Sequence, residues 1–191
     1  MLNTEQLLGG YRSGIFPMAV NPGGGIGWFS PDPRALIPLD ARFHISHGLR
    51  RALNRNKFQI SFDHDFEAVI RACSKSHGES WISAEIIQSY RQLHREGHAH
   101  SVEARIDGEL IGGLYGVHIG GAFFGESMFH QIADASKVAL VELVERLRAR
   151  GFALLDTQWM TPHLAKFGTF LVAKSDYLRL LRDALARDCK F

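Results

Sequence analysis

Three polar side chains near the ends of two predicted strands are the best candidates for chemistry in this sequence. Glu126 follows two phenylalanines and a glycine, and Asp156 and Gln158 follow the apolar run 152–155. The i, i+2 spacing of Asp156 and Gln158 sends both side chains to one face of a strand. A carboxylate beside a carboxamide can orient an amine or a carbonyl, although it makes a weak base. Strand ends are common places for chemistry, so these residues form a candidate catalytic site.

Each of these acids also has a structural interpretation. Glu126 lies in the least polar part of the chain, where an acid is costly unless it meets a cation or hydrogen-bond donors. It could receive a basic group of a substrate, or it could form a buried pair with a residue such as Lys137. Asp156 and Gln158 could do no more than cap the turn after their strand. The residues alone leave these alternatives open.

Metal and serine-nucleophile chemistry have little support in the residue pattern. His94 and His98 are four residues apart, but Gly97 interrupts the helix between them, and no carboxylate stands where a third ligand would be needed. Ser127 has the wrong flanking residues for a GxSxG nucleophile elbow. We therefore expect no metal site and no serine triad.

The elements that must position the candidate residues alternate between helices and strands. Residues 15–38 hold five of the six prolines and Gly23-Gly24-Gly25 together with several aromatics, which predicts an ordered loop packed on the rest of the chain. Asp107-Gly108 predicts a two-residue hairpin turn. Hydrophobic periodicity and end signals predict helices near 4–13, 46–55, 66–73, 83–97, 136–151 and from 175 onward, and strands at 58–62, 102–106, 109–119, 122–129 and 152–155.

This order predicts an α+β protein. From about residue 60 it resembles the N-acetyltransferase-like (GNAT) fold, with a mixed, mostly antiparallel sheet. We expect a GNAT-like domain at 61–191 and a small N-terminal region at 1–60.

A basic segment at 42–57 is the strongest charge asymmetry in the chain. Residues 41–62 contain no acid, and two of the arginines lie one helical turn apart on the same face. Such a segment can bind a phosphate backbone, or it can be an ordinary solvated helix face. The basic residues are Arg42, Arg50, Arg51, Arg55 and Lys57.

Bulk composition limits the class of protein. The 191 residues are 46% hydrophobic, and the formal net charge is only +2, so nucleic-acid contact must come from a local patch. The two cysteines are far apart and fit a reducing compartment. We see no signal peptide and no apolar run that reaches the eighteen or so residues of a membrane span, so we expect a soluble cytoplasmic protein.

A series of motifs across nearly the whole chain resembles the leucyl/phenylalanyl-tRNA–protein transferase family. Many short blocks in the same order make the resemblance specific. They are Tyr11-Arg12-Ser13-Gly14-Ile15-Phe16-Pro17, Trp28-Phe29-Ser30-Pro31-Asp32-Pro33-Arg34, Trp81-Ile82, His98-Ala99-His100-Ser101-Val102-Glu103, Gly112-Gly113-Leu114-Tyr115-Gly116-Val117, Gly125-Glu126-Ser127-Met128-Phe129, Ala135-Ser136-Lys137 and Leu155-Asp156-Thr157-Gln158.

The resemblance implies an aminoacyltransferase that uses neither a metal nor a coenzyme. The family moves leucine, phenylalanine and, as a third candidate, methionine from aminoacyl-tRNA to proteins that begin with arginine or lysine, which creates N-degrons. Glu126 then corresponds to the acid that receives the acceptor's basic residue. Asp156 and Gln158 correspond to the pair that orients the attacking amine and the carbonyl. The partners are leucyl-tRNA, phenylalanyl-tRNA and acceptor proteins, and we expect a monomer.

The same resemblance assigns binding roles. Met18 stands where the family has a tryptophan, and Leu114 and Leu143 stand where other side chains occur in the pocket. The basic segment corresponds to the surface that holds tRNA phosphates. The substrate-binding candidates are Tyr11, Met18, Trp81, Leu114, Phe123, Ser127 and Leu143.

Three rival functions remain to be tested. An acetyl-CoA-dependent GNAT enzyme is disfavoured because residues 129–136 lack the glycines of a pyrophosphate loop. A non-catalytic tRNA- or degron-binding module would have no need of Asp156 or Gln158. A transferase for acceptors that begin with aspartate or glutamate should carry cations where Glu126 and Asp156 stand.

Overall fold

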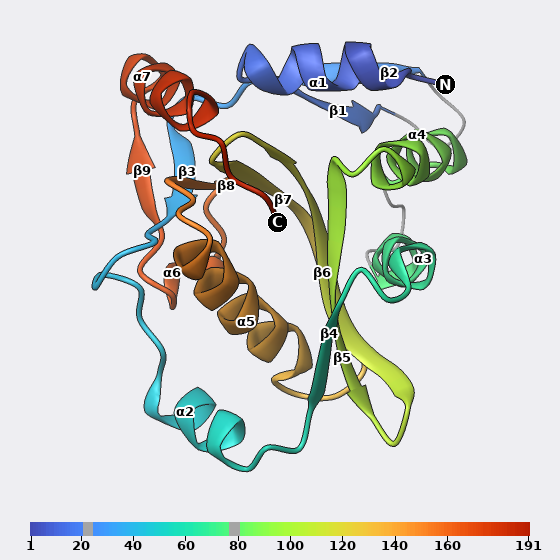
Figure 1. Ribbon diagram of the computed structural model, residues 1–191, viewed down its shortest axis with the longest axis vertical. Coiled ribbons are helices and arrows are strands. Elements are labelled where there is room, and N and C mark those ends of the chain that lie inside the picture. The colour runs from blue at the N-terminus through green and yellow to red at the C-terminus, as the bar shows by residue number, and fades with distance from the viewer. Residues whose placement is uncertain (21–24, 77–80) are drawn as a thin grey trace.

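A seven-stranded mixed sheet organises the molecule, and helices cover both of its faces (Figure 1). The computed structural model describes residues 1–20, 25–76 and 81–191. The strand order is β4-β5-β6-β7-β8-β3-β9, in which only the β7–β8 pair is parallel. The strands are β3 (Arg34–Ile37), β4 (Gln59–Phe62), β5 (Ala99–Ile106), β6 (Glu109–Ile119), β7 (Ala122–His130), β8 (Leu154–Gln158) and β9 (Phe170–Val172). The predicted α+β class, with a mixed and mostly antiparallel sheet, is confirmed.

Two layers of helices bury the two faces of the sheet. One face packs against α1 (Thr4–Arg12), α3 (Phe66–Ser76), α4 (Ala84–Arg95) and α7 (Lys174–Leu185). The other face packs against α5 (Ala135–Ala149), with α2 (His47–Asn54) and the short α6 (Pro162–Ala165) beside it. Figure 1 shows α5 on one side of the sheet and α3 and α4 on the other.

Local signals explain where several of these elements begin and turn. Asn3 caps α1, because its side chain accepts the Gln6 N–H in a capping box. Ser83, where the sequence predicts a helix to begin, caps α4 by accepting the Ile86 N–H. Asp107 and Gly108 both have positive φ, which suits the predicted two-residue hairpin turn between β5 and β6.

The expectation of an irregular loop at 15–38 is wrong. The segment contains a small antiparallel sheet, β1 (Phe16–Ala19) with β2 (Ile26–Phe29), and then β3 of the main sheet. A two-stranded ribbon tolerates Pro17 because each of its strands has a free edge. β3 has only four residues between two prolines, which is too short to show a strand period. Gly23 and Gly24 of the predicted loop lie outside the described residues.

The first sixty residues and the remainder share the main sheet. β3 lies between β8 and β9, and both pairings are antiparallel. α1 contributes Leu7, Leu8 and Tyr11 to the core that also contains α3 and α4. The division into 1–60 and 61–191 stays a prediction.

The strand glycines that the sequence places in β6 stand where the backbone is closely approached. A Cβ on Gly112 would lie 2.5 Å from the Cβ of Ala135 and 3.0 Å from its carbonyl carbon, at the start of α5. No described atom beyond its chain neighbours and its own helix backbone lies within 4 Å of a Cβ on Gly9, in α1.

We predict that Gly112→Ala lowers the free energy of unfolding by about 1–3 kcal/mol, because the start of α5 must move. The matched change Gly9→Ala should raise it by up to about 1 kcal/mol, because alanine favours a helix and meets no steric obstacle. Urea denaturation followed by circular dichroism measures both values. Equal effects from the two substitutions would contradict the close packing of α5 on β6.

Candidate active site

A β-bulge places Glu126 in the site. In the β6–β7 ladder Tyr115 pairs with Ser127 and Gly116 pairs with Gly125, which leaves Glu126 as the extra residue. A bulge re-aims side chains and locally increases the strand twist. Glu126 and Ser127 therefore depart from strict alternation, and both line the same cavity.

Glu126 is held by tyrosines. The Tyr11 hydroxyl donates to Glu126 Oε1 over 2.7 Å, and the Tyr90 hydroxyl donates to Oε2 over 3.3 Å. The two tyrosine hydroxyls also contact each other. Lys137, the alternative structural partner, instead forms an ion pair with Asp134 at 2.7 Å. Lys137 is therefore not the partner of Glu126, which lines the cavity.

The surroundings of Glu126 raise the pKa of its carboxyl group. Burial raises its pKa from 4.5 to about 7, against the opposing effect of the hydrogen bonds from Tyr11 and Tyr90. The negative charge of Asp156 raises the pKa of Glu126 further, and the positive charge of Arg34 lowers it. Burial and the charge of Glu126 raise the pKa of Tyr11 and Tyr90, so both hydroxyls stay protonated as donors.

Asp156 is fully buried and is surrounded by donors. Arg34 Nε donates to both carboxylate oxygens at 2.9 and 3.1 Å, and Arg34 Nη2 donates to Oδ2 at 2.8 Å. The Tyr177 hydroxyl donates to Oδ2 at 2.7 Å, and the Gln158 backbone N–H donates to Oδ1 at 2.9 Å. A carboxylate that accepts this many bonds is suited to hold other groups in place.

Gln158 joins the two acids. Its φ of +59° lies in the left-handed region, which a non-glycine residue occupies only when its surroundings hold it there. The bond from its N–H to Asp156 supplies part of that restraint. Its side-chain Nε2 donates to Glu126 Oε1 at 3.3 Å. The carboxamide is thus directed at the cavity acid.

Glu126 and Gln158 border a cavity of about 850 Å³, whereas Asp156 does not line it. One part is apolar and lies between the sheet and α5. Glu126 is the one carboxylate among the described residues that line the cavity. The apolar part is lined by Leu114, Met128, Leu140, Leu143, Leu155 and Leu164.

The structure brings together most of the substrate-binding candidates. The candidates that line the cavity are Met18, Trp81, Leu114, Ser127 and Leu143.

Tyr11 and Phe123 lie elsewhere. Tyr11 is fully buried behind Glu126, so it can reach a substrate only through that carboxylate. Phe123 is also fully buried, and its ring stacks on Phe191 with centroids 5.4 Å apart.

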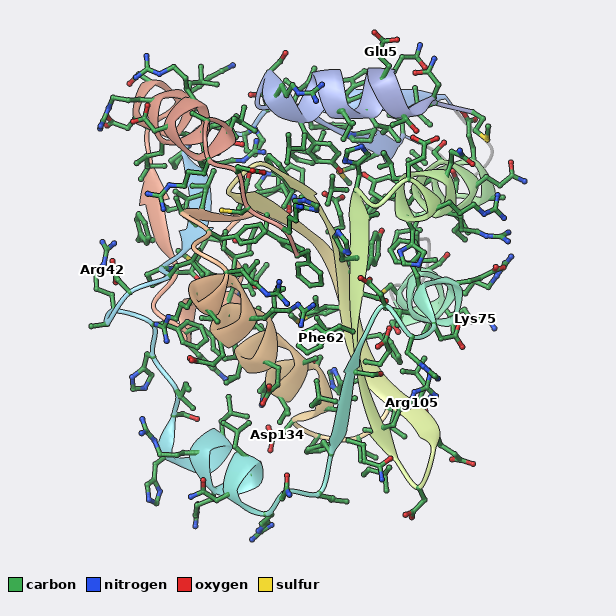
Figure 2. All side chains as sticks on the ribbon, viewed as in Figure 1. Glu5, Arg42, Phe62, Lys75, Arg105 and Asp134 are labelled. Carbon is green, nitrogen blue, oxygen red and sulfur yellow. The ribbon has the colours of Figure 1, made fainter. Side chains whose placement is uncertain are left out.

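The basic segment forms an exposed surface on and beside α2. Arg50, Arg51, Arg55 and Lys57 are exposed and make no ion pair with any residue that the structure describes. Arg42 extends outward at the edge of the molecule in Figure 2, where it pairs with Asp40 at 2.7 Å. Four unpaired cations on one short segment are free to contact phosphates.

Sequence reasoning missed Arg34, Tyr90 and Tyr177. Arg34 stands directly before the buried run 35–37, so a charge beside an apolar run was its only signal. The tyrosines read as ordinary core positions of their helices. Nothing in the sequence indicated that their hydroxyls converge on the two acids.

Within the described ranges, no cluster of three or more His, Cys, Asp or Glu side chains is arranged to hold a metal ion. None of the helices in those ranges combines the length and apolarity needed to cross a membrane.

The site combines an apolar wall of leucines with one carboxylate among the described residues that line the cavity. Two protein-family models match the chain. The leucyl/phenylalanyl-tRNA protein transferase model matches residues 36–182, and the model of that family's N-terminal domain matches residues 1–32. The chain belongs to the leucyl/phenylalanyl-tRNA protein transferase family.

Similar curated proteins cover the whole chain. A leucyl/phenylalanyl-tRNA–protein transferase of Herpetosiphon aurantiacus is 54% identical over 100% of this chain and 98% of its own length. One from Akkermansia muciniphila is 54% identical over 96% of each chain. Among solved structures, a ribosomal-protein-alanine N-acetyltransferase from Brucella melitensis biovar Abortus 2308 is similar over 51% of this chain and 76% of that one, at 15% identity and a TM-score of 0.38.

We predict that Glu126→Gln stabilises the protein at pH 8 by about 2 kcal/mol and has little effect near pH 4.5. The folded state holds the Glu126 proton up to about pH 7, whereas the unfolded chain releases it near 4.5. Stability conferred by the protonated carboxyl is therefore lost as the pH rises from about 4.5 to 7, and glutamine removes that loss. Thermal unfolding of both proteins at the two pH values measures the difference. A variant that is less stable than the parent at pH 8 would contradict the raised pKa of the acid.

Proposed function

We propose that this protein transfers leucine or phenylalanine from its tRNA to the N-terminal arginine or lysine of an acceptor protein. The observation that carries the proposal is Glu126, the one carboxylate among the described residues that line the cavity, with the Gln158 carboxamide 3.3 Å from it and an apolar wall of leucines in the same cavity. Membership of the transferase family supplies the donor class. The site then has a place for each of the two substrates.

The apolar part of the cavity is the place for the donor's side chain. Leu114, Leu140 and Leu143 offer flexible aliphatic walls without a polar group that would demand a partner. A volume of about 850 Å³ exceeds the needs of one side chain, so the terminal adenosine can enter beside it. Trp81 and Met18 line the cavity with Glu126 and can pack on the adenine.

The acidic part is the place for the acceptor. Burial disfavours the charged form of Glu126. A guanidinium or ammonium group that reaches the carboxylate stabilises that charge by an ion pair. Binding of that cation also favours the ionised form of the acid, since an opposite charge lowers a carboxyl pKa. An acceptor that begins with an acid would meet Glu126 with a like charge and should be rejected.

The reaction itself needs little covalent help from the protein. The α-amine of the acceptor attacks the ester carbon of the aminoacyl group, a C–N bond forms, and the C–O bond to the ribose breaks. The amine loses a proton and the ribose oxygen gains one. Because the ester is already activated, alignment of the amine with the carbonyl is the main contribution. Gln158 orients these groups by hydrogen bonding, and Asp156 holds the turn that carries Gln158.

The exposed arginines of α2 are the place for the tRNA body. Arg50, Arg51 and Arg55 can contact phosphates without first breaking an ion pair within the described structure. Contacts of this kind read the shape and charge of the RNA more than its sequence. α2 packs against α5, the helix that walls the apolar part of the cavity, so the two substrate sites share a rigid support.

The remaining inferences concern the cellular setting. Transfer of a bulky apolar residue to a basic N-terminus would mark the acceptor as an N-degron for degradation. One chain supplies every residue of the site, so a monomer suffices. We place the protein in the cytoplasm, where aminoacyl-tRNA and acceptor proteins are both present.

We predict that labelled leucine passes from leucyl-tRNA to a peptide beginning with arginine and not to one beginning with aspartate. Glu126→Gln should lower kcat/KM for the arginine peptide by about 100-fold, because the basic group loses its ionic partner. The exposed change Glu109→Gln serves as the matched control and should have no effect. Transfer to neither peptide, or acetyl transfer from acetyl-CoA instead, would contradict the proposal.

We also predict that the double variant Arg51→Gln, Arg55→Gln raises KM for leucyl-tRNA about tenfold and reduces its salt dependence, because two phosphate contacts are lost. The rate with leucyl-adenosine, a donor without the tRNA body, should not change. Arg71→Gln removes an exposed arginine that pairs with Glu67 and is the control. An equal loss with the small donor would place these arginines in the reaction site instead.

A further inference from the structure

Arg34 is a fully buried cation that the proposed reaction does not use. Its side chain is 1% exposed and that of Asp156 is 0% exposed. The guanidinium lies between two aromatic rings, with its carbon 4.9 Å from the centroid of Phe16 and 4.5 Å from that of Tyr177. Burial alone would lower its pKa, but the hydrogen bonds and charge of Asp156 outweigh this and raise it. Arg34 therefore keeps its positive charge although it is buried.

The guanidinium joins four separate parts of the chain. From β3 it reaches Asp156 on β8, and its Nη1 donates to the carbonyl of Gly14, in the turn after α1, at 3.1 Å. The ring of Tyr177 on α7 covers it. α1 also carries Tyr11, the donor to Glu126. A single side chain thus fixes the supports of both Asp156 and Glu126.

Neither Arg34 nor Asp156 lines the cavity, so their effect on a substrate must pass through other residues. A buried ion pair is weak evidence of stability, because its desolvation offsets much of its attraction. The pair leads directly to the reacting groups, since Asp156 holds the Gln158 backbone and Gln158 bonds to Glu126. This chain of contacts suggests a role beyond packing.

We propose that Arg34 is a positioning residue for aminoacyl transfer: it fixes Asp156 so that Gln158 is aimed at Glu126, and its charge cancels that of Asp156 so that Glu126 alone attracts the acceptor. This inference rests on the proposed function and assigns a further residue to the same site. The step that Arg34 supports is alignment of the amine, and no bond to Arg34 forms or breaks.

The charges around Glu126 set the pH dependence of the KM for the acceptor. A residue with a purely structural role would not change that pH dependence. The titratable groups facing Glu126 are Tyr11 from α1, Tyr90 from α4, Tyr115 from β6 and Asp156 from β8, with Arg34 from β3 behind Asp156. Of these, Arg34 supplies the positive charge. Removing Arg34 leaves the negative charge of Asp156 without a compensating positive charge. That negative charge then disfavours ionisation of Glu126. The pH at which acceptor KM improves should therefore move upward.

The experiment compares Arg34→Met and Arg34→Lys with the parent enzyme and with Arg71→Met, which removes an exposed arginine paired with Glu67. Transfer from leucyl-tRNA to an arginine peptide is measured between pH 6 and 9, at a temperature where circular dichroism shows each variant folded. For Arg34→Met we expect kcat about 100-fold lower, KM for leucyl-tRNA unchanged, and the midpoint of the acceptor KM profile at higher pH. Arg34→Lys should keep the pH midpoint of the parent enzyme but recover only part of kcat. Lysine retains the positive charge but lacks the planar set of N–H donors of the guanidinium.

Two further variants keep the test decisive if Arg34→Met does not fold. Tyr177→Phe removes one hydrogen bond to Asp156 and keeps the ring over Arg34, and we expect a fall in kcat of about fivefold with a melting temperature lowered by only a few degrees. The double variant Arg34→Met, Asp156→Asn removes both charges. It should recover thermal stability relative to Arg34→Met but should not recover kcat.

The outcomes separate this inference from the proposed function. If the parent enzyme does not transfer leucine, the proposed function fails. If the parent transfers leucine and the folded Arg34 variants keep its kcat and its pH midpoint, Arg34 is only structural and the inference is overturned. Recovery of kcat in the double variant would overturn it as well, because activity would then follow stability alone.

Discussion

The ion pair between Arg34 and Asp156 is the interaction on which the site depends. It lies where β3 and β8 meet in the sheet, and it is covered by Tyr177 of α7 and tied to the turn after α1. Because a buried charge must keep its partner and its donors, the pair fixes the relative positions of all four.

The two acids of the site differ because their surroundings differ. Asp156 meets a guanidinium, a tyrosine hydroxyl and a backbone N–H, and its charge is cancelled. Glu126 meets only neutral donors, and burial raises its pKa to about 7. One carboxylate is therefore committed to holding the structure, and the other remains available to a cation from outside. Separation of two carboxyl groups by environment is a general way to give them different tasks.

Sequence reasoning succeeded where a pattern repeats over many residues. The amphipathic helices α4, α5 and α7 and the β5–β6 hairpin were all visible as periods, turns or end signals. It failed at β1, β2 and β3, where prolines and glycines suggested a loop. Strands of four residues show no period, and β3 owes its strand conformation to neighbours that are more than a hundred residues away in the chain.

The sequence by itself determined the family, the α+β class and which polar residues stand at strand ends, because these depend on residue order and local periodicity. The tertiary structure decided which residues meet. It placed the Tyr11 hydroxyl on Glu126, left Asp156 outside the lining of the cavity, and brought Arg34 and Tyr177 to Asp156. Sequence could not decide these points, because hydrogen bonds between residues 21 to 122 positions apart exist only after the sheet has assembled.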